Sequence, residues 1–92
     1  MTELELRKEL GLGLRHQRVE RGLSQAQLAA MIGRQRADIS KIELGKVNAT
    51  INSIAALCIA LQTDFWVVAR HGAQGRLQGA SPPANADGPH AG

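Results

Sequence analysis

Apolar residues recur at helical spacing between Ser24 and Gly45, in two short patterns separated by Gly33. Gln27 follows Ser24 by three residues, and this spacing predicts a capping box at the start of the first pattern. Gly33 and Gly45 follow the two patterns, and glycine readily adopts the left-handed conformation that ends a helix. The stretch is therefore predicted to form a helix, a tight turn and a second helix. The predicted buried faces are Leu28, Ala29 and Ile32 in the first helix and Ala37, Ile39 and Ile42 in the second.

Two further helices are predicted on either side of this unit. The first covers residues 2–21 and begins with a second capping-box pair, Thr2 and Glu5. Gly11 and Gly13 lie inside it, where each glycine costs about 1 kcal/mol relative to alanine unless it permits close packing. The last helix is predicted to begin at the N-cap residue Thr50. The predicted core positions of these two helices are Leu6, Leu10 and Leu14, followed by Ile51, Ile54, Leu57, Cys58 and Leu61.

After Leu61 the pattern becomes strand-like. The segment from Phe65 to Arg70 begins with five apolar residues, including the two aromatic residues of the chain, and predicts a short strand. A lone strand leaves its backbone unpaired, so we expect antiparallel pairing with a second copy across a twofold axis. A C-terminal flap folded back on its own domain is the alternative. The expected dimerisation residues are Ile59, Phe65, Trp66, Val67, Val68 and Ala69.

Composition and charge narrow the class of protein. The 92 residues, 43% of them hydrophobic, suffice for one small core. A net charge of +3 and a pI near 9.8 favour polyanionic partners, which leaves nucleic acid and membrane surfaces both open. The single cysteine excludes an internal disulfide, and neither a signal-like run nor an apolar run of about 18 residues is found. We therefore expect a cytoplasmic protein without a membrane segment.

The candidate chemical groups do not form a catalytic set. Cys58 lies on an apolar stripe, which favours a buried structural thiol over a nucleophile. His16, His71 and His90 show no metal-ligand spacing. No acid, base and nucleophile converge, so we expect neither an enzyme nor a cofactor or metal site.

The helix predicted after Arg34 has an unusual polar face of long or forked hydrogen-bonding side chains. An α-helix fits the major groove of duplex DNA, where arginine and lysine can address guanine and glutamine can address adenine. A solvated helix face is the alternative. The polar residues of this face are Gln35, Arg36, Asp38, Ser40 and Lys41.

The ordered residues of this region resemble the signature of the Cro/CI-type (XRE) helix-turn-helix family. The resemblance covers about residues 10–61. It implies an all-α, lambda-repressor-like bundle of four to five helices, to which the predicted strand would add dimer pairing. It also implies a sequence-specific transcriptional repressor that binds double-stranded operator DNA as a homodimer. The matching residues are Gly22-Leu23-Ser24-Gln25, Leu28-Ala29, Ile32-Gly33, Ile39-Ser40, Ile42-Glu43-x-Gly45, and also Leu14-Arg15, Arg18, Thr50, Ile54, Leu57 and Leu61.

The resemblance also implies a role for individual residues. Arg18 is expected to form an ion pair with Glu43 close to a DNA phosphate. The residues expected to contact bases are Arg36, Ala37 and Lys41, with Gln35, Asp38 and Ser40 beside them. Those expected to contact phosphate are Arg18, Gln25, Arg34, Lys46 and Asn48.

A helix-turn-helix domain followed at once by one strand further resembles HipB-type antitoxins, whose partner is a HipA-type kinase toxin. This narrower resemblance implies an autorepressor of a toxin–antitoxin operon. The alternatives are a stand-alone phage or restriction-modification regulator and a protein adaptor that does not bind DNA. The expected organisation is a helix-turn-helix domain over residues 1–61, a dimerisation strand over 62–70 and a flexible tail over 71–92.

Overall fold

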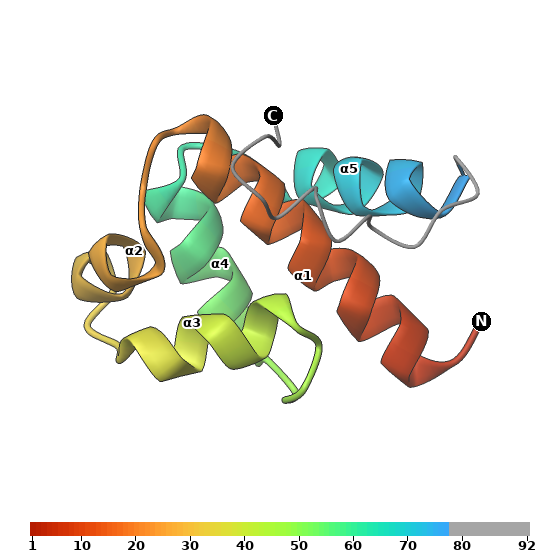
Figure 1. Ribbon diagram of the computed structural model, residues 1–92, viewed down its shortest axis with the longest axis horizontal. Helices are drawn as coiled ribbons and strands as arrows, with labels where there is room; N and C mark the ends of the chain where they lie inside the picture. The colour runs from red at the N-terminus through yellow and green to blue at the C-terminus, as the bar shows by residue number, and fades with distance from the viewer. Residues whose placement is uncertain (78–92) are drawn as a thin grey trace.

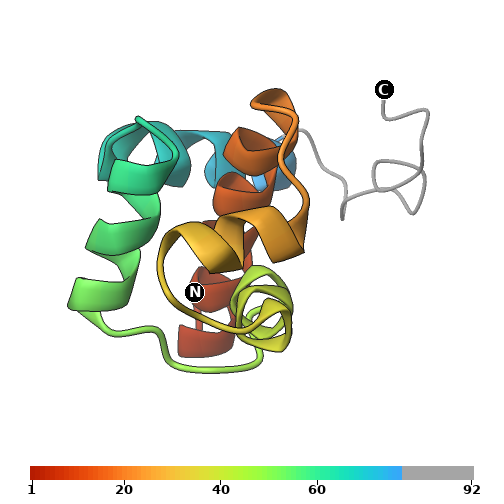
Figure 2. The same ribbon diagram turned by 90° about the vertical axis from the view of Figure 1, so that its left-hand side faces the viewer.

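The computed structural model describes residues 1–77 as five helices joined by short connections (Figure 1). Helix α1 crosses the molecule, with α3 and α5 on opposite sides of it. Figure 2 shows α4 at the edge, with no other described helix outside it. The helices are α1 (Glu3–Glu20), α2 (Gln25–Met31), α3 (Arg36–Glu43), α4 (Ile51–Ala60) and α5 (Phe65–Leu77).

The N-terminal caps predicted for α1, α2 and α4 are present in the structure. At α1 the Thr2 hydroxyl accepts from the Glu5 N–H at 3.1 Å, and the Glu5 carboxylate accepts from the Thr2 N–H at 2.6 Å. The same reciprocal pair joins Ser24 and Gln27 at 3.0 and 2.7 Å. The Thr50 hydroxyl accepts from the Ser53 N–H at 3.0 Å. These bonds satisfy backbone donors that have no partner inside a helix, and they confirm the three predicted caps.

The core lies between the five helices, each of which contributes at least one buried apolar residue. Of the predicted apolar positions, Leu10, Ile32 and Ile54 are only partly buried. The burial of Cys58, and secondarily the charge of Asp64, raise the pKa of the thiol, which fits the structural role expected for this cysteine. The buried apolar residues are Leu14, Leu28, Ala29, Ile39, Ile42, Leu57, Cys58, Leu61 and Val68.

Three predicted core positions are exposed. Leu6 is 48% exposed because a step of four residues turns a helix by 40° more than a full turn, so the stripe drifts outward from Leu14. Ile51 is 81% exposed, since the buried face of α4 is centred on Leu57. Ala37 lies on the solvent side of α3. The prediction that these three residues are buried was wrong.

The predicted strand at Phe65 to Arg70 was also wrong, because the segment is the first half of α5. Asp64 directly precedes this helix and caps it, because its carboxylate accepts from the Val67 N–H at 3.0 Å. Val68 packs in the core and is 1% exposed. The chain therefore follows the alternative of folding back on its own domain, as a helix. Helix α5 also includes residues 71–77 of the predicted tail, and residues 78–92 lie outside the described part.

Glycines set how closely α1 approaches its two neighbours. A Cβ on Gly13 would overlap the Val68 carbonyl of α5, and one on Gly72 would overlap the Glu9 carbonyl of α1. On the other side of α1, a Cβ on Gly11 would overlap the Glu43 carbonyl of α3. Two helices can meet at backbone distance only where side chains are absent. The alternative role given to Gly11 and Gly13, to permit close packing, is therefore confirmed.

Within residues 1–77, no single helix combines the length and apolar character that a bilayer crossing requires. Helices α4 and α5 reach that threshold only when counted together, and they are bent by 92° with respect to each other.

The glycine contact gives a stability prediction. On helix propensity alone, Gly13→Ala would stabilise the protein by about 1 kcal/mol. Because the added methyl overlaps the backbone of α5, we expect instead a loss of about 1–3 kcal/mol in the free energy of unfolding. Urea denaturation followed by circular dichroism measures the change, and a more stable variant would contradict the close α1–α5 contact.

Candidate nucleic-acid interface

Helices α2 and α3 form the predicted helix-turn-helix unit. Gly33 has φ +69°, and the N–H of the following Arg34 donates to the Ala29 carbonyl at 2.8 Å, which closes the turn. Gly45 has φ +72° and ends the second helix in the same way. The left-handed conformation predicted for Gly33 is confirmed, and so is the predicted stop of the second helix at Gly45. A side chain at either position would be strained, since L-residues with a Cβ rarely adopt this conformation.

Helix α3 has one face in the core and the opposite face in solvent. Ile39, Ile42 and Glu43 are at most 7% exposed and hold the helix against the rest of the domain. The predicted base-contact residues lie elsewhere on the helix and at its start. Gln35, Arg36, Ala37 and Lys41 are exposed, and Asp38 and Ser40 are partly buried.

Asp38 has a structural partner at the start of α3. Its carboxylate accepts from the Gln35 N–H at 3.1 Å, at the end of the helix where backbone donors lack partners. A carboxylate facing DNA is repelled by phosphate. The capping hydrogen bond gives Asp38 a structural role that does not depend on contact with a base. The sequence signal for this role is acidic residues near helix N-termini.

A buried ion pair joins α1 to the end of α3. The Arg18 guanidinium donates to the two Glu43 carboxylate oxygens at 2.6 and 3.1 Å, and the two side chains are 8% and 4% exposed. Arg18 also donates to the Leu23 carbonyl at 2.8 Å. The structure therefore contains the expected Arg18–Glu43 pair. It places the guanidinium inside the protein, where little of it is open to a phosphate.

The same carboxylate is linked to the exposed start of α3 through Gln25. The Gln25 amide donates to Glu43 at 3.0 Å, and its oxygen accepts from the Arg36 guanidinium at 3.0 Å. Arg36 therefore rests on a side chain that is itself anchored to the buried pair. This arrangement restricts the rotamers of Arg36 before any ligand is present.

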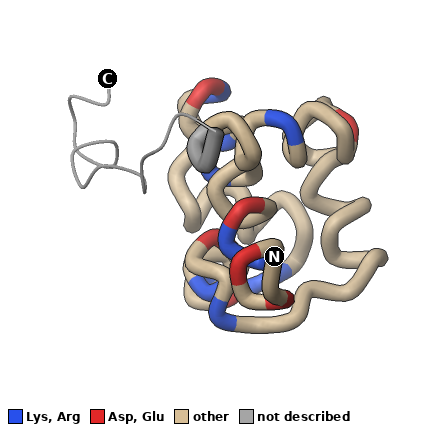
Figure 3. Tube along the Cα trace, turned by 90° about the vertical axis from the view of Figure 1, so that its right-hand side faces the viewer, with Lys and Arg blue, Asp and Glu red and all other residues tan. Residues whose placement is uncertain are grey.

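The acidic residues between Gly22 and Ala49 are engaged within the protein. They are Asp38 and Glu43, with the partners given above. At the start of α1, by contrast, acidic and basic positions are interspersed (Figure 3). The Arg7 guanidinium nitrogen Nη1 lies 3.4 Å from the Glu3 carboxylate oxygen Oε1. The basic residues between Gly22 and Ala49 are Arg34, Arg36, Lys41 and Lys46, all of them exposed. The surface of the helix-turn-helix unit is thus positive.

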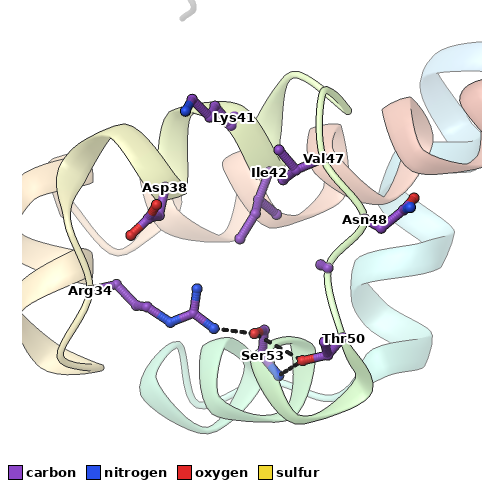
Figure 4. Close-up of a pocket in the computed structure, with 9 residues that line it drawn as sticks. Arg34, Asp38, Lys41, Ile42, Val47, Asn48, Thr50 and Ser53 are labelled. Atoms are coloured by element: carbon purple, nitrogen blue, oxygen red, sulfur yellow. Dashed lines mark hydrogen bonds between the residues drawn. The ribbon is translucent and has the colours of Figure 1, made fainter.

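A cavity of about 270 Å³ lies between α3, the α3–α4 loop and the start of α4 (Figure 4). Arg34 reaches across it and donates to the hydroxyl of the buried Ser53. Lys41 and Asn48 contribute to the lining from the other side. Two of the predicted phosphate contacts, Arg34 and Asn48, therefore meet at one depression beside α3.

Sequence reasoning missed Arg7, which holds the loop after α3. Its guanidinium donates to the Gly45 carbonyl at 3.2 Å and to the Asn48 side chain at 3.0 Å. These partners are 38 and 41 residues away, so no local signal could have identified them. Lys46 lies in the same loop and remains exposed.

Comparisons with known proteins agree with this geometry. Residues 9–69 match the family model described as a helix-turn-helix domain. The clp gene regulator ClgR from Corynebacterium glutamicum has a TM-score of 0.74 and 28% identity, over 79% of each chain. The restriction-modification controller protein C.AhdI from Aeromonas hydrophila has a TM-score of 0.70 and 28% identity, over 74% of this chain and 99% of its own. A comparison with curated proteins finds no match.

The family model covers most of the chain, and both similar structures are of regulators. Regulators of this kind are in general not enzymes. The chain belongs to the helix-turn-helix family of DNA-binding transcription regulators.

Proposed function

We propose that this regulator is a free-standing transcriptional repressor, which acts in the cytoplasm by inserting α3 into the major groove of operator DNA. The observation that carries the proposal is the orientation of α3. Ile39 and Ile42 fix its inner face in the core, while Arg36 and Lys41 project into solvent from the outer face. A rigid helix with exposed cationic, forked donors fits the groove in which base edges are distinguishable.

The base-contact residues have separate roles in this proposal. Arg36 reads guanine O6 and N7 with its two-pronged guanidinium, and Lys41 makes a single-point contact five residues further along the helix. Ala37, exposed between them in the sequence, meets a thymine methyl group. Gln35 and Ser40 supply neighbouring polar contacts. Asp38 keeps its hydrogen bond to the N–H at the start of α3. Its carboxylate also either accepts from cytosine N4 or orients Arg34 or Lys41.

Phosphate contacts position α3 without reading sequence. Lys46 is exposed on the loop after α3 and is the simplest of these contacts. Arg34 and Asn48 line the depression beside α3, and Gln25 lies at the start of α2. Arg18 acts mainly through Glu43, because its guanidinium is committed to partners inside the protein.

A homodimer supplies the twofold symmetry, with α5 in place of the expected strand. Ile59, Phe65 and Trp66 remain exposed by 76%, 42% and 74%, and Ile51 by 81%. Helix α4 carries no charged residue, so two copies can pack there without repulsion between like charges. Val68 is used by its own core, and Val67 and Ala69 are partly buried. The recognition helices of such a dimer would lie about 34 Å apart, in successive major grooves.

The antitoxin hypothesis loses the feature on which it depended. It rested on a single C-terminal strand, and that segment is α5. Two of the similar proteins are a clp gene regulator and a restriction-modification controller, which supports a regulator without a toxin partner. A HipA-type kinase that co-purifies with the full chain, or is encoded beside it, would restore the antitoxin hypothesis. Failure to bind its own promoter DNA would favour a protein adaptor.

Replacing Arg36 and Lys46 separately distinguishes base reading from phosphate contact. Arg36→Ala is expected to cost about 1–3 kcal/mol on the specific site and to relax preference at one base pair. Lys46→Ala is expected to weaken specific and random DNA alike and to reduce the slope of log affinity against log salt by about one unit. Titrations of promoter fragments and random duplexes at several salt concentrations measure both effects. Equal losses on the two kinds of DNA for Arg36→Ala would contradict its assignment to a base.

Trp66→Glu tests the proposed dimer. A carboxylate at this exposed position would be desolvated in the interface, so we expect the variant to sediment as a monomer at concentrations where the wild type is a dimer. Leu4→Glu is the matched control, because Leu4 is also exposed, at 44%, but lies on α1. An unchanged dimer in Trp66→Glu would refute this interface.

A further inference from the structure

The contact between α1 and α5 contains a buried amide with both ends engaged. The Gln17 side chain is 3% exposed, and its nitrogen lies 2.7 Å from Nδ1 of His71. The oxygen of the same amide accepts from the Arg21 guanidinium at 3.0 Å. Because an arginine can only donate, this second bond fixes which end of the amide faces the imidazole.

The amide orientation determines the protonation state of His71. An amide nitrogen only donates, so Nδ1 must offer a lone pair and the ring must be neutral, with its hydrogen on Nε2. A second proton on Nδ1 would place one N–H against another. Turning the amide over would not relieve the conflict, since its NH₂ group would then face the Arg21 guanidinium.

The ionisable groups near His71 belong to α1 and α5. The His16 ring of α1 lies 4.2 Å away between centroids, and Arg70 precedes His71 on α5. Burial contributes most to lowering the pKa of His71 below its ordinary value near 6.5, and His16 and Arg70 add to this effect. Glu20 opposes it, but its carboxylate is 3.5 Å from His16. Helix α4, which also packs on α5, carries no charged residue.

We propose that Gln17 and His71 form a proton-sensitive latch, which holds α5 against α1 while the imidazole is neutral and loosens it when the imidazole is protonated. The latch lies in the same contact as two backbone approaches, Gly13 to Val68 and Gly72 to Glu9. Such close packing tolerates little displacement, so a repelled ring separates the helices over the whole contact. Release of α5 uncovers Val68, which is 1% exposed when the latch is closed.

The direction of the pH effect follows from linkage. His71 binds a proton more weakly in the folded protein than in the open state. The stability that the latch provides is therefore complete well above a pH of about 6.5 and is lost as the pH falls below that value.

Hydrogen exchange of the full chain, followed by mass spectrometry between about pH 8 and about pH 5, tests the latch over the range in which histidine changes charge. After correction for the intrinsic effect of pH on exchange, protection of α5 amides should fall relative to α3 amides. One proton taken up on opening limits the fall to about tenfold per pH unit. The NMR titration of His71, assigned by through-bond correlation to its backbone in the wild-type protein, should have a midpoint below the ordinary histidine value.

Variants of the two partners give the decisive comparison. His71→Gln should remove the pH dependence of α5 protection, and His16→Gln, which leaves the Gln17 bond in place, should retain part of it. Gln17→Glu should invert the dependence, because a carboxylate accepts from a protonated imidazole. The latch is refuted if His71→Gln keeps the pH dependence of the wild type. Should variants fail to fold, a wild-type His71 midpoint at or above the ordinary value would refute it equally.

Discussion

The buried ion pair between Arg18 and Glu43 is the interaction on which the interface depends. Removing one partner of such a pair leaves an uncompensated charge in the interior, at a cost of about 3–5 kcal/mol. The pair makes two further hydrogen bonds, to the Leu23 carbonyl and to the Gln25 amide, which lie before and at the start of α2. Helices α1, α2 and α3 are thereby held in one relative orientation. That orientation leaves the outer face of α3 in solvent and anchors Arg36, through Gln25, to the interior.

Glycine packing around α1 complements the ion pair. Gly11 of α1 allows the end of α3 to approach on one side of the helix. On the other side, Gly13 of α1 and Gly72 of α5 allow the backbones of these two helices to approach each other. Because α1 is covered from both sides at backbone distance, little room remains for relative sliding of the three helices. The outer side of α4 receives no such cover, and its apolar residues stay exposed. The protein therefore has a rigid surface that presents α3 and, separately, an exposed apolar face on α4 that carries no charge.

Charge is divided between the inside of the domain and its surface. Glu43 is neutralised in the core and Asp38 is occupied by the backbone at the start of α3, whereas the basic residues from Arg34 to Lys46 are exposed. A modest net charge of +3 can thus produce a positive surface at one place. Arg36 and Lys46 also differ in how their side chains are held. Arg36 is restrained by its hydrogen bond to Gln25, while Lys46 lies on an exposed loop.

The sequence by itself determined the helix boundaries that depend on neighbours within about four residues: the caps at Thr2, Ser24 and Thr50 and the glycine that ends α3. The family signature added the Arg18–Glu43 pair, which spacing alone could not give. Only the tertiary structure decided that residues 65–77 are a helix, since a short apolar run fits a strand or a buried helix equally well. The same holds for the contacts of Arg7 and His71, whose partners lie 38 to 54 residues away. Local hydrogen bonding acts within a turn, whereas these contacts exist only after packing has brought distant helices together.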